Sequence, residues 1–95
     1  MVTLGFYLDK NHIGHHSVIH DHTFIVSHVV ISGGVEIGEQ CFVGVNATLR
    51  DHIKIGDRCV VGAGALVLAD AASEGVYLGA ATGRSKVPST RLRGI

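Results

Sequence analysis

Apolar residues recur at every sixth position along most of this chain. One register holds an aliphatic side chain at each step: Ile13, Ile19, Ile25, Ile31, Ile37, Val43, Leu49, Ile55, Val61 and Val67. A small or β-branched residue follows four positions after each: Ser17, Thr23, Val29, Val35, Cys41, Ala47, Ile53, Cys59, Ala65 and Ala71. A period of six fits neither an amphipathic helix nor a long alternating strand. It predicts short strands joined by corners, as in a parallel β-helix. If the aliphatic register is numbered as the first slot of each six-residue repeat, the small residues occupy the fifth slot, and both slots are expected to face inward.

The slots between these two indicate where the corners lie. The fourth slot holds His16, His22, His28, Gly34, Gln40, Asn46, His52, Arg58, Gly64 and Asp70. Gly, Asn, Asp and His are the residue types that best tolerate positive φ, so we expect left-handed backbone at each of these positions. The second slot is often glycine, at Gly14, Gly38, Gly44, Gly56 and Gly62, where a missing Cβ lets neighbouring backbone pass close.

The length and the pattern predict one all-β domain over residues 1–95, with about four coils over about 7–78. Met1 and Tyr7 continue the register only weakly, and the repeat ends at Ala72. We expect a last strand over 76–78 and an irregular basic tail over 79–95.

So short a solenoid leaves its end coils open and buries only a modest core. Phe24, Phe42 and Val60 fall on outward positions, which favours burial of these side chains against other subunits. The sequence therefore predicts a closed cyclic oligomer.

Charge is distributed unevenly in a chain whose formal net charge is zero. Residues 1–74 hold four basic and eight acidic side chains, whereas the tail holds Arg84, Lys86, Arg91 and Arg93 and no acid. A neutral chain argues against nucleic acid as the main partner. The basic tail either binds a small phosphorylated ligand or is a solvated terminus. No apolar run approaches a membrane span and no signal-peptide pattern opens the chain, so we expect a cytoplasmic protein without a membrane partner.

Cys41 and Cys59 occupy the same slot, eighteen residues apart, and are expected to stack on successive coils. The predicted spacing does not exclude a disulfide. Both positions nevertheless call for a small buried residue, a role that free cysteine fills well. The chain has no CxxC or other zinc-binding spacing.

Histidine is the candidate for chemistry. Six of the seven histidines fall between residues 12 and 28: His12, His15, His16, His20, His22 and His28. Four of the seven histidines lie in the fourth slot and are most simply corner residues: His16, His22, His28 and His52. His15 lies in the third slot and His20 in the slot that glycine dominates, so neither is explained by corner geometry. These two are the best functional candidates.

Several segments resemble one family of enzymes. Residues 11–17 (NHIGHHS), 27–33 (SHVVISG), 44–48 (GVNAT) and 85–89 (SKVPS) are similar to the hexapeptide-repeat acyltransferases, in particular bacterial sialic acid O-acetyltransferase and nucleotide-amino-sugar N-acetyltransferase relatives. The resemblance implies a left-handed parallel β-helix with three hexads per coil, assembled as a homotrimer. Relatives often carry an N-terminal nucleotide-binding domain that this sequence lacks.

The resemblance also implies a reaction and its residues. Acetyl would pass directly from acetyl-CoA to an amine or hydroxyl of a sugar or nucleotide sugar, with no metal. His15 matches the general base of the family, and His16 stands where relatives often have an acid. An imidazole, with an ordinary pKa of about 6.5, suits that task at neutral pH. Implied acceptor contacts are Asn11, His12 and His28; implied cofactor contacts are Gly44, Asn46, Gly62, Ala63, Gly64, Arg84 and Lys86.

Two other functions stay open from the sequence. The spacing of His15 and His20 is similar to the metal-ligand pair of γ-class carbonic anhydrases, which share the β-helix and the trimer. Their third histidine lies about two coils earlier, at a position that would precede Met1. The other alternative is a non-catalytic assembly module whose histidines are surface residues.

Overall fold

The computed structural model describes residues 5–7, as backbone, and residues 10–91. It contains short strands and one 3₁₀ turn, η1 (Ser89–Arg91). The strands are β1 (Gly5–Tyr7), β2 (His12–Ile13), β3 (Val18–Ile19), β4 (Thr23–Ile25), β5 (Val30–Ile31), β6 (Glu36–Ile37), β7 (Phe42–Val43), β8 (Thr48–Leu49), β9 (Lys54–Ile55), β10 (Val60–Val61), β11 (Leu66–Val67) and β12 (Val76–Tyr77).

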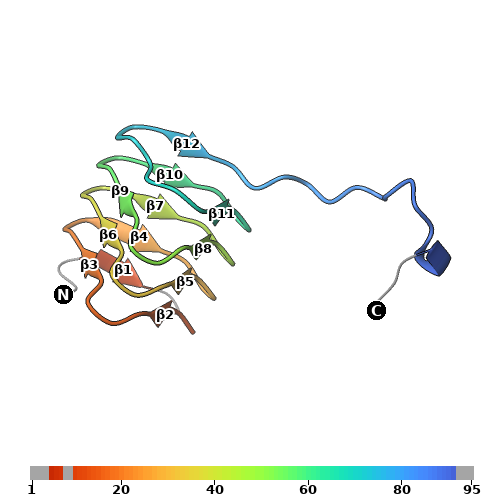
Figure 1. Ribbon diagram of the computed structural model, residues 1–95. Helices are drawn as coiled ribbons and strands as arrows, with labels where there is room; N and C mark the ends of the chain where they lie inside the picture. The colour runs from red at the N-terminus through yellow and green to blue at the C-terminus, as the bar shows by residue number, and fades with distance from the viewer. Residues whose placement is uncertain (1–4, 8–9, 92–95) are drawn as a thin grey trace.

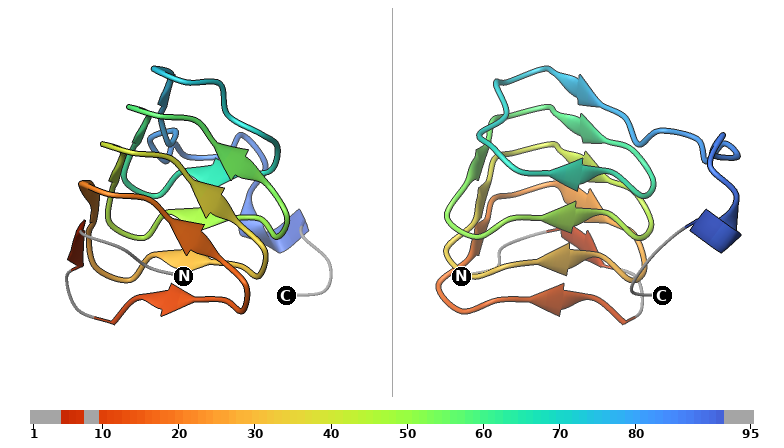
Figure 2. Two further views of the ribbon diagram at one scale, coloured as in Figure 1. Left: turned by 90° about the vertical axis from the view of Figure 1, so that its left-hand side faces the viewer. Right: turned by 45° about the vertical axis from the view of Figure 1, so that its right-hand side comes forward.

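These strands stack into three parallel sheets that form the sides of a triangular prism (Figure 1, Figure 2). We name them the β1 face (β1-β4-β7-β10-β12), the β2 face (β2-β5-β8-β11) and the β3 face (β3-β6-β9). Partners lie eighteen residues apart, as in Phe24 opposite Phe42 and His12 opposite Val30. The fold is the predicted left-handed parallel β-helix of about four coils.

The prism interior holds the first and fifth slots of the repeat. The first-slot residues from Ile19 to Val67 are all buried, and so are the fifth-slot residues from Ser17 to Ala71. Burial of so many aliphatic side chains is the main favourable contribution to folding. The predicted inward pattern is confirmed.

Corners join the faces. Corner A (14–17, 32–35, 50–53) lies between the β2 and β3 faces, corner B (20–23, 38–41, 56–59) between the β3 and β1 faces, and corner C (10–11, 26–29, 44–47, 62–65) between the β1 and β2 faces. Fourth-slot residues have φ between 55° and 62°: His16, His22, His28, Gln40, Asn46, His52 and Arg58. Gly34 and Gly64 have φ of 72° and 69°. The expected left-handed corners are therefore present.

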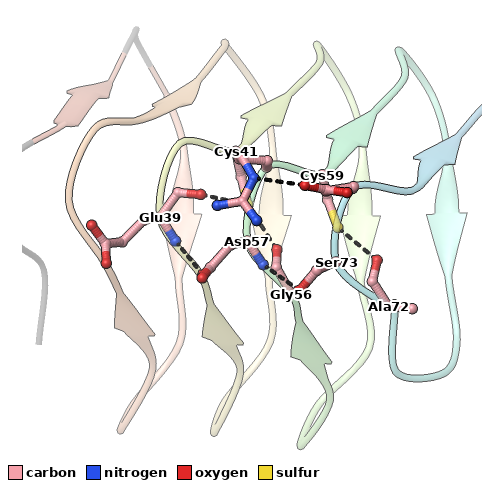
Figure 3. A network of polar contacts seen from close by, with 9 residues as sticks. Glu39, Cys41, Gly56, Asp57, Cys59, Ala72 and Ser73 are labelled. Carbon is pink, nitrogen blue, oxygen red and sulfur yellow. Dashed lines mark hydrogen bonds and ion pairs between the residues drawn. The ribbon is translucent and has the colours of Figure 1, made fainter.

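Small polar residues satisfy the carbonyl groups at two of these corners. At corner B, the Thr23 hydroxyl donates to the Gly38 carbonyl at 2.8 Å, and the Cys41 thiol donates to the Gly56 carbonyl at 3.1 Å. The Cys59 thiol continues the series by donating to Ala72, as Figure 3 shows. Both cysteines are buried and free, as the interpretation of their slot predicted.

The last coil differs from the prediction. Val76 pairs with Val60 and Ala71 with Ile55, sixteen residues apart instead of eighteen. The repeat therefore does not end at Ala72; it loses two residues at one corner and then completes another coil. Asp70 does not take the left-handed conformation, because the two residues are lost at its own corner, corner A. At the next corner, corner B, Glu74 takes the place of Arg58 one coil earlier, with φ of 65°. The Asp70 carboxylate instead accepts the Lys54 N–H at 2.9 Å.

Residues 79–91 form an arm that runs away from the prism (Figure 1). They are exposed throughout and contain no strand, as expected for the tail. If the sixteen-residue register of β12 continued, the next strand would lie above β11 and Gly83 would fall in the inward slot over Val67. Glycine has no side chain to bury there, so a further strand would gain little apolar burial. Met1 and Arg93 lie outside the described residues. Among 5–7 and 10–91 there is no helix with the length and apolarity needed to cross a membrane.

Candidate functional site

Corner A presents His15 and His16 to solvent next to β3. Both rings are exposed, and their centroids lie 6.4 Å apart with 51° between the planes. The backbone is fixed by the His15 carbonyl, which accepts the Gly34 N–H at 2.9 Å. No carboxylate of the described residues hydrogen-bonds to either ring, so no carboxylate in that part of the chain orients the predicted base.

The predicted acceptor residues lie at the same end of the prism. His12 projects outward from β2 and is exposed, whereas His28 lies at corner C with φ of 58°. The Asn11 side chain accepts the Val29 N–H at 2.8 Å and so joins two coils at corner C. The first coil of the β2 face is thus bordered by His15 and His16 on one edge and by Asn11 and His28 on the other.

Most of the predicted cofactor residues meet at corner C on the next two coils. The Gly64 N–H donates to the Val45 carbonyl at 2.8 Å, which stacks the 62–65 corner on the 44–47 corner. A Cβ at Gly44 would lie 2.7 Å from the Ala63 nitrogen, so only glycine allows the two backbones to approach so closely. A Cβ at Gly64 would meet nothing within 4 Å. Gly44 is thus buried between coils, whereas Gly64 exposes bare backbone over which an extended ligand can lie.

Arg84 and Lys86 are not part of that corner. Both are exposed on the arm, which leaves the prism at the top of corner C. Gly79, where the arm begins, lies against the corner, because a Cβ there would be 2.5 Å from the Ala63 carbonyl oxygen. Four residues lie between Gly79 and Arg84, so the five Cα–Cα steps reach up to about 17 Å when the chain is extended.

The structure adds a contact that the sequence did not reveal. His20, at corner B, lies 2.9 Å from Glu36 of β6, measured from Nε2 to Oε2, with 42% and 46% of the side chains exposed. The pair borders a groove of about 680 Å³ on the β3 face, next to Lys54 of β9. The sequence carried one signal for this site, since Glu36 and Lys54 stand eighteen residues apart in the outward slot.

His15 and His20 do not form a metal centre within one chain. They belong to corners A and B, at opposite ends of β3. Over the described ranges no three His, Cys, Asp or Glu side chains are grouped as metal ligands. The geometry of a single chain thus gives the carbonic anhydrase alternative no support.

Comparisons with known proteins agree with the repeat and the fold. Residues 34–69 match the family described as bacterial transferase hexapeptide (six repeats). A histidine-to-alanine mutant of GDP-perosamine N-acetyltransferase from Caulobacter crescentus, in complex with CoA and GDP-perosamine, is 26% identical with a TM-score of 0.56. The alignment covers 82% of this chain and 47% of that chain.

A histidine-to-asparagine mutant of perosamine N-acetyltransferase from the same organism, also with CoA and GDP-perosamine, is 20% identical with a TM-score of 0.55. It covers 79% of this chain and 50% of that chain, so this chain spans about half the length of these proteins. No curated protein sequence matches. The resemblance to hexapeptide-repeat sugar acetyltransferases is confirmed.

Proposed function

We propose that this hexapeptide-repeat chain is an acetyl-CoA-dependent acetyltransferase that acts on an amine or hydroxyl of a sugar or nucleotide sugar. The observation that carries this proposal is the likeness of its β-helix, at 26% identity, to an N-acetyltransferase bound to CoA and GDP-perosamine. The exposed imidazoles at one end of the prism and the glycine-containing corner C on the coils above are the two parts that such a reaction needs. We expect the reaction to take place in the cytoplasm.

The proposed base is His15. It takes a proton from the acceptor while the acceptor attacks the thioester carbonyl, and the protonated imidazole then supplies a proton to the departing thiolate. The negative charge on the carbonyl oxygen is stabilised by backbone N–H groups that no side chain covers. His16 assists at the same corner. Asn11, His12 and His28 contact the acceptor across the first coil of the β2 face.

The cofactor is proposed to lie along corner C. Its pantetheine arm passes over Gly44, Asn46 and the 62–64 segment, where Gly62 and Gly64 leave the backbone without a covering side chain of their own. Arg84 and Lys86 meet the phosphates of CoA, since the arm begins at the top of this corner. Both side chains keep their N–H groups available for phosphate oxygens. No metal takes part in this scheme.

We propose a homotrimer as the active form. Phe24 and Phe42 stack at 5.7 Å on the outside of the β1 face, and Val60 and Val76 extend the same apolar stripe, 38% and 62% exposed. Packing this stripe against the next chain removes it from water and places both of its edges, corners B and C, in a seam between two chains. In the proposed trimer this seam also contains corner A of the neighbouring chain. His15 of that chain then lies next to the cofactor bound at corner C of the first chain.

Cofactor binding and one substitution test the proposal. Acetyl-CoA at millimolar concentration is expected to raise the melting temperature, because a ligand with micromolar affinity for the folded state alone stabilises it by several kcal/mol, about 4.1 at a thousandfold excess over Kd. His15→Ala is expected to lower the rate of thiol release by at least about 100-fold.

The matched control is His22→Asn, which removes an exposed imidazole at a corner where asparagine keeps the positive φ. It is expected to retain the activity. Absence of stabilisation by acetyl-CoA would favour the non-catalytic assembly module, and full activity in His15→Ala would remove His15 as the base.

A further inference from the structure

The groove on the β3 face is a concave site that the proposed reaction has not yet used. Its volume of about 680 Å³ lies in the range of small-molecule sites, about 300–1,000 Å³. It is lined by His20, Glu36, Glu39, Lys54, Asp57 and Asp70, with Gly38 and Gly56 in its floor between them. Figure 3 shows corner B next to this groove, where the Asp57 carboxylate accepts the Glu39 N–H and the Asp57 N–H donates to the Ser73 hydroxyl oxygen. The groove is large enough for a sugar ring.

The His20–Glu36 pair gives this groove a defined proton acceptor. A carboxylate only accepts hydrogen bonds, so the neutral His20 ring donates from Nε2 across the 2.9 Å contact. Its Nδ1 then carries a lone pair. A carboxylate that holds one imidazole nitrogen fixes both the tautomer and the ring orientation, which is how bases are positioned in enzyme sites. By this criterion His20 is better oriented than His15.

The charges of the groove select the chemical form of the ligand. Glu36, Glu39, Asp57 and Asp70 face a single ammonium group, that of Lys54. Asp57 and Asp70 each use one oxygen to accept a backbone N–H at 2.9 Å, from Glu39 and Lys54 respectively. The excess of carboxylates, combined with the oriented imidazole, favours a positively charged amine over a neutral or anionic group in the part of the ligand that enters the groove.

The position of corner B connects the groove to the reaction. Corner B is the edge shared by the β3 and β1 faces. In the trimer proposed above, burial of the β1 face brings this edge into the seam that contains His15 of the neighbouring chain. The amino-sugar ring of an acceptor seated in the groove of one chain can therefore present its amine to the base and cofactor of the same seam. The rest of the acceptor then contacts Asn11, His12 and His28 of the neighbouring chain.

We propose that the groove binds an amino-sugar acceptor and that His20, held by Glu36, removes the first proton from its ammonium group. The inference rests on the proposed acetyltransferase function. An ammonium group has no lone pair, so one proton must leave before attack. Nδ1 of His20 takes that proton and releases it to solvent.

The acyl transfer follows once the amine is neutral. The free amine attacks the thioester carbon, an N–C bond forms and the C–S bond breaks. The second amine proton passes through His15 to the departing thiolate. The products are an amide, the CoA thiol and one proton.

Two acceptors test the proposal in steady-state kinetics: GDP-perosamine, whose acceptor group is an amine, and the matched sugar nucleotide in which a hydroxyl replaces that amine. His20→Asn is expected to lower kcat/KM for the amine at pH 7 by about 100-fold. Glu36→Gln is expected to lower it by about 10-fold, because the ring loses its orienting carboxylate. At pH 9 the deficit of His20→Asn shrinks, since a larger share of the acceptor is already the free amine. His22→Asn is the control and should behave as wild type.

The outcomes separate this proposal from the one it rests on. Unchanged kcat/KM in His20→Asn, or a deficit of equal size at pH 7 and pH 9, overturns the role of His20. An equal loss for the hydroxyl acceptor also overturns it, because a hydroxyl has no ammonium proton to remove. A wild-type protein that acetyl-CoA does not stabilise overturns the acetyltransferase function itself, and this inference with it.

Discussion

At the scale of single residues, the thiols and hydroxyls of the fifth slot are small enough for a tight corner and are hydrogen-bonded although they are buried. Ser17, Thr23, Cys41 and Cys59 each donate to a carbonyl group of the next coil, so the polar atom that a small residue brings inside is satisfied. An unsatisfied buried donor costs about 1–3 kcal/mol. The choice among Ser, Thr and Cys at these positions is therefore a matter of hydrogen bonding as much as of volume.

The Cys41 thiol makes stability depend on pH. Burial raises its pKa above the ordinary value, and burial is the largest of the causes. The folded state therefore holds the thiol proton more tightly than the unfolded state does. The stability that the protonated thiol contributes is fully present at pH values below its pKa in the unfolded state, about 8.5. This contribution is lost as pH rises through its pKa in the folded state. Urea unfolding at pH 8 and pH 10 should show this loss.

Cys41→Ser provides the comparison, because serine can donate to Gly56 in the same way and does not titrate in this range. The wild-type protein is expected to lose more stability than Cys41→Ser between the two pH values. Parallel losses would show that ionisation of this thiol is not linked to unfolding.

Imidazoles at the corners show what a residue pattern can and cannot predict. The fourth slot predicted left-handed backbone at His16, His22, His28 and His52, because few residue types accept that conformation, and all four have positive φ. The partner of His20 was not predictable in the same way. Glu36 lies sixteen residues away in an outward slot, where solvent tolerates any polar side chain and the repeat imposes no residue type.

At the scale of the coil, glycine has two separate functions that substitution can distinguish. Gly14→Ala would place a Cβ 2.5 Å from the Gly33 backbone nitrogen, where no flexible side chain can move aside. It should destabilise the protein by about 3 kcal/mol. Gly64→Ala meets no atom within 4 Å but must adopt φ of 69°, which costs roughly 1–2 kcal/mol.

Gly83→Ala is the matched control, since a Cβ there contacts nothing and its φ lies outside the left-handed region. Its effect should stay within about 0.5 kcal/mol. Urea denaturation at one fixed protein concentration ranks the three variants. Equal losses for Gly14→Ala and Gly83→Ala would contradict the close approach of the coils.

The hexad predicted the strands and corners from Ile13 to Val67 because both inward slots are constrained at every step. It failed at the last coil for a physical reason. Residues 69–73 are small or polar, so they fit the regular register and the shortened one equally well. The choice is made by contacts far along the chain, such as the Asp70 side chain on Lys54 and the Tyr77 ring packed against the end of the core.

At the scale of the whole molecule, the apolar stripe of the β1 face predicts the assembly. Phe42→Asp should convert a particle of about 30 kDa, three times the chain mass of 10.0 kDa, into a monomer. The reason is that a carboxylate at this position would be buried without a partner at the seam. Light scattering after size exclusion measures the change.

Val87→Asp serves as the control, because it adds the same charge to an exposed apolar position on the arm. It should leave the mass unchanged. A wild-type protein that elutes at 10.0 kDa would contradict the trimer, and with it the joining of His15 and the glycine corner in one seam.

The eighteen-residue register also makes the prism a molecular ruler. Each coil adds about 4.8 Å along the axis of the prism, and equivalent side chains on successive coils point in the same direction from that axis. His12, His15 and His16 lie on the first coil, and Gly62 and Gly64 lie on the coils above it. Gaining or losing one whole coil between them would therefore lengthen or shorten their separation by a single rung without rotating either group. Size discrimination among substrates can evolve in such rungs, through duplication of a segment that already folds.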